Sequence, residues 1–122
     1  MNTRRKELIE QYKQMKTDMG IFWIRARGGS KCFLEISQNV NGLMNRMKFQ
    51  LNMGMHVNKE LQQEWTRLGE AQFDIETLEL IKYDKDESKT DYSEELAILK
   101  FVWEEKLAND NFTFYRHKLK NS

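Results

Sequence analysis

The residues whose chemistry could serve a metal site or a nucleophile are few in this sequence and lie far apart. Two histidines, His56 and His117, and a single cysteine, Cys32, are the candidates. They do not have the spacing of a zinc site, and a lone cysteine in an apolar run is normally a small buried residue. We expect His56 to be a solvated or helix-capping loop residue. The sequence therefore predicts no metal, no cofactor and no reactive thiol.

Paired carboxylates are the second group capable of chemistry. Glu94-Glu95 and Glu104-Glu105 both fall in a segment with the apolar period of a helix. We expect both pairs to lie on a solvated helix face, since metal binding by one of them would require a shifted helical register.

Two apolar segments and the turn between them predict a β-hairpin. Residues 19–26 and 31–37 are rich in β-branched and aromatic residues, and a Gly-Gly pair lies between them. A third strand is expected near residues 73–80. Its alternation slips near Thr77, which indicates a bulge.

Helical periodicity predicts the remaining elements at residues 39–53, 58–68 and 92–107. Asn39 is the expected N-cap of the first of these helices. Asp91 with Glu94 resembles a capping box at the start of the last one. The first helix has a wide apolar stripe formed by Val40, Leu43, Met44, Met47 and Leu51.

The order of elements predicts an α+β fold with a small antiparallel three-stranded sheet flanked by helices. An extra N-terminal helix is expected over residues 4–16, and a C-terminal tail over 109–122. The length of 122 residues suits one domain covering 1–122, with its core at about 18–107.

Charge is nearly balanced overall, at +1, but unevenly distributed. Residues 1–27 hold seven basic and three acidic residues, whereas residues 71–110 hold five basic and twelve acidic residues. Proteins that bind duplex DNA normally have a basic surface, so the acidic segment argues against tight DNA binding. The sequence has no signal-peptide pattern and no apolar run of membrane-spanning length. We expect a cytoplasmic protein that does not contact membranes.

An ordered set of short motifs resembles the GIY-YIG endonuclease family. The two name-giving tripeptides of that family fall on residues 20–22, Gly-Ile-Phe, and 33–35, Phe-Leu-Glu, and Met55-His56 follows later. The resemblance covers roughly residues 18–107. It implies the same α+β architecture that the order of elements predicts.

The resemblance also implies which positions would form an active site, and most of them hold other residues. The two tyrosines of the family fall on Phe22 and Phe33, which keep the ring and lack the hydroxyl. Its arginine falls on Leu43 and its helical histidine on Met47. Its metal-binding glutamate falls on Lys100, which would repel a metal ion.

Phosphodiester hydrolysis needs a metal held by a carboxylate and a cation for the developing charge. We therefore predict that the chain is not an enzyme but a nuclease-like protein whose catalytic residues are replaced. A polar active-site position of some members is matched by His56 alone. The vestigial catalytic positions are Phe22, Phe33, Leu43, Met47, His56 and Lys100.

Apolar residues at positions that the family keeps polar would leave a hydrophobic patch with charged neighbours, which is typical of protein interfaces. We predict binding of another protein, with the acidic segment 74–95 as a second candidate surface. Because this family is common in phages and mobile elements, an inhibitor of a host nuclease or defence protein is one specific form. The predicted partner-binding residues are Phe22, Phe33, Glu35, Leu43, Met47 and Lys100.

Two alternatives stay open. One is an active endonuclease with displaced catalytic groups. The other is a DNA-binding module without catalysis, which Glu35 disfavours because the family has glycine near the scissile phosphate. The basic residues of such a DNA-binding module would be Arg25, Arg27, Lys31, Arg46, Lys48 and Lys59.

Overall fold

The computed structural model describes residues 4, 5, 7 and 16–116. Most of the predicted N-terminal helix over 4–16 lies outside the described residues, as does the end of the tail. That helix and the prediction of one domain over 1–122 therefore stay predictions.

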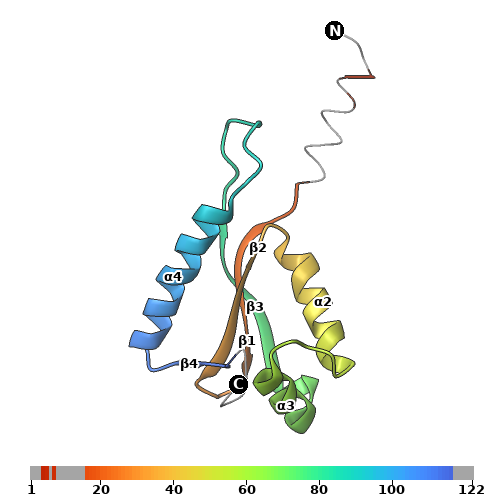
Figure 1. The fold of residues 1–122 in the computed structure, drawn as a ribbon, viewed down its shortest axis with the longest axis vertical. Helices are drawn as coiled ribbons and strands as arrows, with labels where there is room; N and C mark the ends of the chain where they lie inside the picture. The colour runs from red at the N-terminus through yellow and green to blue at the C-terminus, as the bar shows by residue number, and fades with distance from the viewer. Residues whose placement is uncertain (1–3, 6, 8–15, 117–122) are drawn as a thin grey trace.

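A four-stranded sheet forms the centre of the molecule, in the order β3-β1-β2-β4 (Figure 1). β1 (Met19–Ala26) and β2 (Lys31–Ser37) form the predicted antiparallel hairpin. β3 (Phe73–Ile81) pairs antiparallel with the other side of β1, as predicted. β4 (Thr113–Phe114) runs parallel to β2 and was not expected, because a strand of two residues has no periodicity that a sequence could reveal.

The register between β1 and β3 contains the predicted bulge. Ile21 lies opposite Glu79 and Phe22 opposite Thr77, so Leu78 is the extra residue on β3. Just before the bulge the two backbones lie very close, since a Cβ atom at Gly20 would stand 2.0 Å from the carbonyl oxygen of Glu79. Glycine is therefore required there by contact with the neighbouring backbone.

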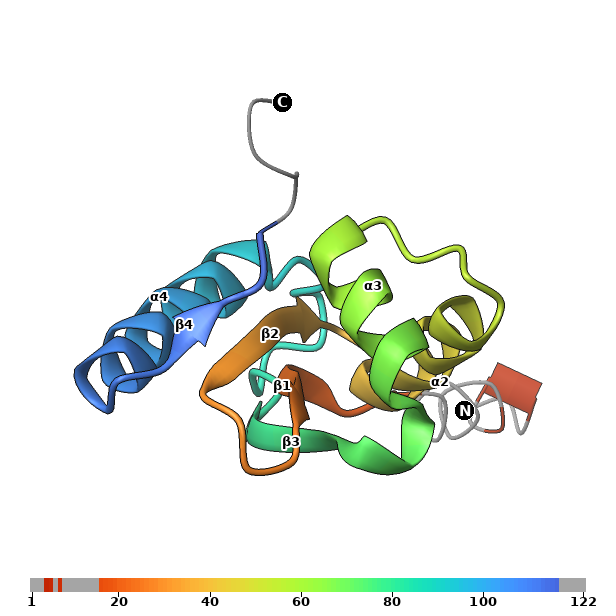
Figure 2. The same ribbon diagram turned by 90° about the horizontal axis from the view of Figure 1, so that it is seen from below.

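Helices cover both faces of the sheet (Figure 2). α2 (Val40–Asn52), α3 (Lys59–Leu68) and the short 3-10 helix η1 (Glu70–Gln72) lie on one face, and α4 (Ser93–Asn109) lies on the other. The three longer helices match the predicted segments to within a few residues, and the α+β fold is confirmed.

The side chain of an asparagine caps the N-terminus of each longer helix on the first face: Asn39 for α2 and Asn58 for α3. The Asn39 side chain accepts a hydrogen bond from the Gly42 N–H at 3.0 Å, which confirms the predicted N-cap of α2. The predicted capping box of α4 is wrong: Asp91 accepts from the Ser93 N–H two residues later, so the N-cap position falls on Tyr92.

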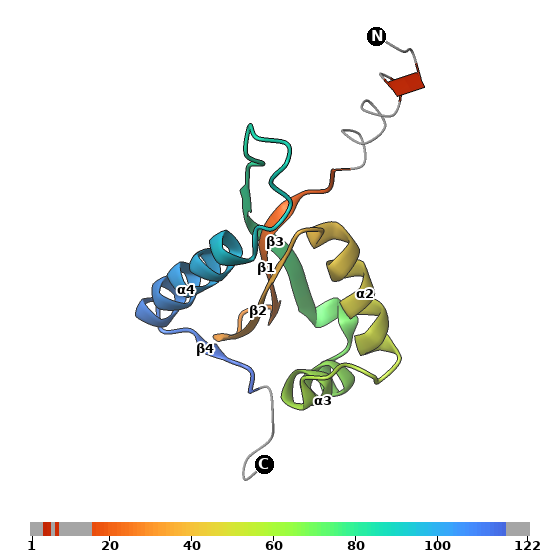
Figure 3. The same cartoon turned by 45° about the horizontal axis from the view of Figure 1, so that its top comes forward.

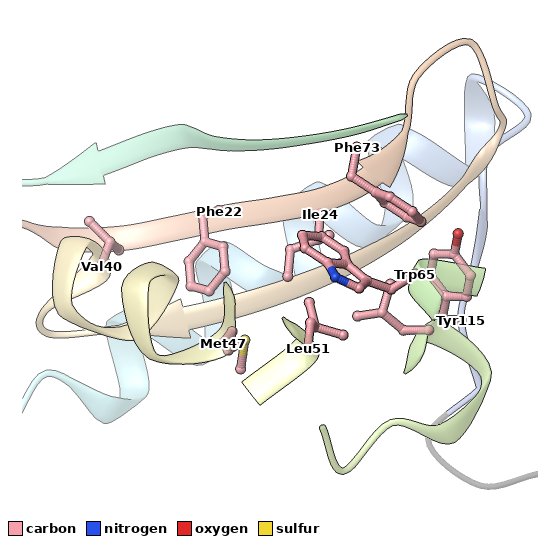
Figure 4. Packing of buried hydrophobic residues seen from close by; sticks show 9 residues of the cluster. Phe22, Ile24, Val40, Met47, Leu51, Trp65, Phe73 and Tyr115 are labelled. Carbon is pink, nitrogen blue, oxygen red and sulfur yellow. The ribbon is translucent and has the colours of Figure 1, made fainter. Parts of the chain in front are cut away.

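The alternation of β1 divides the core into two clusters. Phe22 and Ile24 point toward α2 and α3, whereas Met19 and Ile21 pack against residues of α4. Figure 4 shows the first cluster, with the Phe22 ring directed at α2. Its buried members are Phe22, Ile24, Val40, Met47, Leu51, Leu61, Trp65, Phe73 and Tyr115.

Removing volume from this cluster should destabilise the fold. Leu51 is 2% exposed, so we expect Leu51→Ala to lower the free energy of unfolding by about 2–5 kcal/mol through lost burial and a cavity. Ile98, on α4, is 57% exposed, and Ile98→Ala should change the free energy of unfolding by less than about 0.5 kcal/mol. Chemical denaturation measures both. Equal losses in the two variants would contradict the assigned core.

Candidate functional site

A pocket of about 310 Å³ lies along the outer edge of β2, between the two helical layers. α2 and the loop before α3 contribute residues from one layer, and α4 contributes residues from the other. The lining combines apolar side chains with two carboxylates, one ammonium group, one amide and one phenol. The lining residues are Cys32, Phe33, Leu34, Glu35, Met47, Val57, Asn58, Lys100, Glu104, Phe114 and Tyr115.

Four of the six predicted partner-binding residues come together in this pocket: Phe33, Glu35, Met47 and Lys100. The sheet supplies the first two from alternate positions of β2, with Leu34 between them. Met47 is nevertheless 7% exposed and packs in the α2-side core, so it contributes a wall of the pocket more than an accessible contact.

Phe22 and Leu43 do not line the pocket. Phe22 is fully buried beneath α2, because the alternation of β1 directs it into the core. Leu43 is half-buried and packs against the same cluster. The prediction that Phe22 contacts a partner is therefore wrong for this structure, and Leu43 lies apart from the other predicted residues.

His56 is structural. Its side chain is fully buried, its Nδ1 accepts the Asn58 N–H at 3.0 Å, and its ring meets Phe33 edge-on at 5.3 Å. The expectation of a solvated residue is wrong, and the residue that caps α3 is the neighbouring Asn58. Gln62 accepts the His56 N–H at 2.9 Å, so this buried network fixes the loop that carries Val57 and Asn58 into the pocket.

Asn58 joins three elements at the pocket. Its side-chain oxygen accepts the Leu61 N–H at 3.0 Å and so caps α3. Its amide donates to the backbone oxygen of Tyr115 at 3.4 Å and holds the chain that follows β4. The predicted helix start near Asn58 is confirmed, whereas the link to Tyr115 joins residues 57 positions apart and has no local pattern in the sequence.

Glu104 and Tyr115 were missed as pocket residues. Glu104 lies one helical turn after Lys100, and the i, i+4 spacing could have placed both on one face. The prediction of an entirely solvated acidic pair is corrected for Glu104. Tyr115 donates to the Glu64 carboxylate at 3.4 Å, and burial, followed by the charge of Glu64, raises the pKa of the Tyr115 hydroxyl well above its usual range.

Cys32 is fully buried, as predicted, and burial raises the pKa of its thiol to about 11. At neutral pH the thiol is therefore protonated and is a poor nucleophile. Among the described residues, no group of three or more His, Cys, Asp or Glu side chains is arranged to hold a metal ion. None of the described helices is long and apolar enough to cross a membrane.

Most basic residues of the DNA-binding alternative lie against carboxylates. Arg27 and Arg25 approach Asp74 at 2.9 and 3.9 Å. Lys31 lies 3.6 Å from Glu60, and Lys48 lies 2.9 Å from Glu70. These pairs lower the local positive potential that a phosphate backbone would need.

The Arg27–Asp74 pair predicts a specific pH dependence. Its hydrogen bond holds the pKa of the Asp74 carboxyl below the usual 3.8, so its contribution to stability is present above that value and is lost as pH falls through the lower folded-state pKa. We expect Asp74→Asn to lower the melting temperature slightly near neutral pH and to match the unmodified chain in stronger acid. Glu105→Gln is the control on an exposed residue of α4. An Asp74→Asn deficit that persists in strong acid would contradict this assignment.

The fold is similar to that of two solved structures. The catalytic domain of homing endonuclease I-TevI has 21% identity and a TM-score of 0.61, over 80% of this chain and 98% of that one. A mutant of the catalytic domain of intron endonuclease I-TevI has 20% identity and a TM-score of 0.62, over 84% and 95%. No protein-family model matches the chain, and no curated protein matches it. The GIY-YIG-like fold predicted from sequence is confirmed.

The prediction that the chain is not an enzyme is corrected by this comparison. Both similar structures are catalytic domains of an endonuclease, and an identity near one fifth gives no evidence that activity has been lost. The prediction compared side chains position by position. The structure brings the Glu35 and Glu104 carboxylates together in one pocket beside Lys100, a grouping that such a comparison does not reveal.

Proposed function

We propose that the chain acts by binding another protein, one side chain of which enters the pocket along β2. The lining of that pocket carries the proposal. Apolar walls from Phe33, Val57 and Phe114 stand together with the charged groups of Glu35 and Glu104. Protein interfaces combine an apolar centre with polar surroundings in this way.

Exposed apolar side chains near the pocket support the same proposal. Val57 lines the pocket and is 63% exposed. The preceding stretch of chain also exposes Phe49, Met53 and Met55, each by more than half. A partner that covered these side chains would gain about 25 cal/mol for each Å² of apolar surface removed from water.

Electrostatics favours a protein over duplex DNA as the partner. Four of the basic residues available for phosphate contacts are already close to carboxylates, and the pocket has one more negative than positive side chain. A phosphate would have to displace these acids or approach them. The identity of the protein partner, including a host nuclease or defence protein, stays a prediction.

A charge at Val57 should disrupt binding without disturbing the fold. Val57→Asp should weaken partner binding by tenfold or more, up to about a thousandfold, because a charge buried in an interface without a counter-ion costs several kcal/mol. Val102, which is 52% exposed on α4, provides the matched control Val102→Asp. The partner is captured from a lysate of the source cells at moderate salt, and its affinity is measured with each variant.

Both variants should melt close to the unmodified chain, because both positions are exposed. Capture of nucleic acid alone would contradict the proposal. Loss of binding in Val102→Asp with full binding in Val57→Asp would also contradict it, because the interface would then lie on α4.

A second candidate function is metal-dependent phosphodiester hydrolysis, and one observation favours it. Glu35 and Glu104 line a single pocket in a fold whose similar structures are endonuclease catalytic domains. Two carboxylates suit Mg²⁺ when substrate phosphate and water complete its coordination. The fit is limited, because Glu35 already accepts the Ile36 N–H at 3.0 Å and Lys100 adds a positive charge.

This candidate predicts nicking of plasmid DNA in Mg²⁺ or Mn²⁺. Glu104→Gln should reduce the rate by about a hundredfold or more, as removal of one essential electrostatic group does. Glu105→Gln alters the neighbouring acid, which does not line the pocket, and should retain the rate. Gel assays of purified chains measure both. Equal rates in the two variants would rule out this pocket as the site.

A further inference from the structure

β4 covers only the beginning of the outer edge of β2 (Figure 3). Lys31 pairs with Thr113 and Cys32 with Phe114, and the Tyr115 N–H donates to the Cys32 carbonyl at 3.0 Å. Residues 115 and 116 then bond to the start of α3. The Tyr115 carbonyl accepts from the Asn58 amide instead of continuing the ladder along β2.

Backbone groups of β2 beyond this point face the same open edge. Hydrogen-bonding direction alternates along a strand, so the outward carbonyl of Cys32 places the N–H and C=O groups of Leu34 and Ile36 on the same side, away from β1. Within the described residues, no backbone group pairs with Leu34 or Ile36 across that edge. The open part of the edge therefore offers a short ladder to a strand from elsewhere.

The pocket lies along this open edge. Leu34 and Glu35 are among its lining residues, and Phe114 marks the end where β4 stops. Val57 stands on one side and Lys100 on the other, so the two helical layers flank the edge without covering it. A segment in this position would place side chains alternately toward the two layers, because side chains of a strand alternate.

A side chain protects the open edge in the free protein. The Glu35 carboxylate accepts the Ile36 N–H at 3.0 Å, which satisfies one outward donor from within the strand. This bond is between adjacent residues, so rotation of one side chain releases the donor. The released carboxylate would then be available to a basic group on the incoming segment.

We infer that the partner binds as an extended segment that adds a strand to β2 at Leu34 and Ile36, with an apolar side chain in the pocket and a basic residue beside it. This inference rests on the proposed protein-binding function. The preference for a basic residue follows from charge complementarity, since Glu35 and Glu104 outnumber Lys100 in the lining.

The other outer edge of the sheet is less suited to the same role. β3 carries Glu76 and Glu79, which accept hydrogen bonds from the indoles of Trp23 at 3.1 Å and Trp103 at 2.8 Å. Charged side chains on an edge strand oppose pairing with another strand. β3 therefore has several acidic side chains along its length, whereas Glu35 is the one charged residue on the open part of β2.

The probe for testing this inference is a displayed library of random nine-residue peptides, selected on the unmodified chain. Selected peptides are synthesised with the backbone nitrogens methylated one at a time. We expect every second methylation to weaken binding at least about tenfold, because it removes one ladder hydrogen bond and clashes with β2. Amide exchange at Leu34 should slow when peptide binds. Selected sequences should contain an apolar residue next to lysine or arginine.

Several outcomes would overturn the inference. These are the absence of any selected peptide, affinity that no single methylation changes, and slowed exchange at Ile75 and Thr77 on β3 with Leu34 unchanged. Concentration-dependent dimers that slow Leu34 exchange without peptide would assign the edge to a second copy. If peptide affinity falls with Val57→Asp but not with backbone methylation, the added strand is contradicted and the proposed protein-binding function remains. A cellular partner insensitive to Val57→Asp would remove the proposed function even if selected peptides pair with β2.

Discussion

The arrangement of this protein depends on the burial of β1 between two strands and two helical layers. Ile21, Phe22 and Ile24 are fully buried and point alternately to opposite faces. A shift of one residue in register would exchange the two cores, which contain different side chains. The close approach at Gly20 and the bulge at Leu78 fix that register on the β3 side. All residues discussed as a site are positioned from this central strand outward.

Sequence reasoning predicted the fold better than the site. Strand alternation, the Asn39 cap and the apolar stripe of α2 are local signals, and the structure confirms each of them. The site depends on which face and which edge bring residues together across the chain. Phe22 was assigned to an open surface by analogy, yet the pleat of β1 directs it beneath α2. Glu104 was treated as solvent-facing, although it enters the pocket together with Lys100.

The buried network around His56 explains how the loop before α3 is held at the pocket. His56, Asn58 and Gln62 form hydrogen bonds with one another and with nearby backbone groups, which offsets part of the cost of burying them. Nearby, the Leu51 carbonyl accepts from the Gln62 amide at 2.9 Å, which links the end of α2 to α3. The position of Val57 at the pocket is a consequence of this network and not of any preference of the loop itself.

The pairing of β4 with β2 also has a consequence for the order of folding. It joins residues 31–32 to residues 113–114, which are among the most distant partners along the sequence, through two residue pairs. Such a contact must close a long loop, so we expect it to form after the hairpin, when Tyr115 is buried in the core. Opening it would expose the Cys32 carbonyl and lengthen the free edge of β2. The length of that edge therefore depends on whether residues 113–115 stay paired with β2.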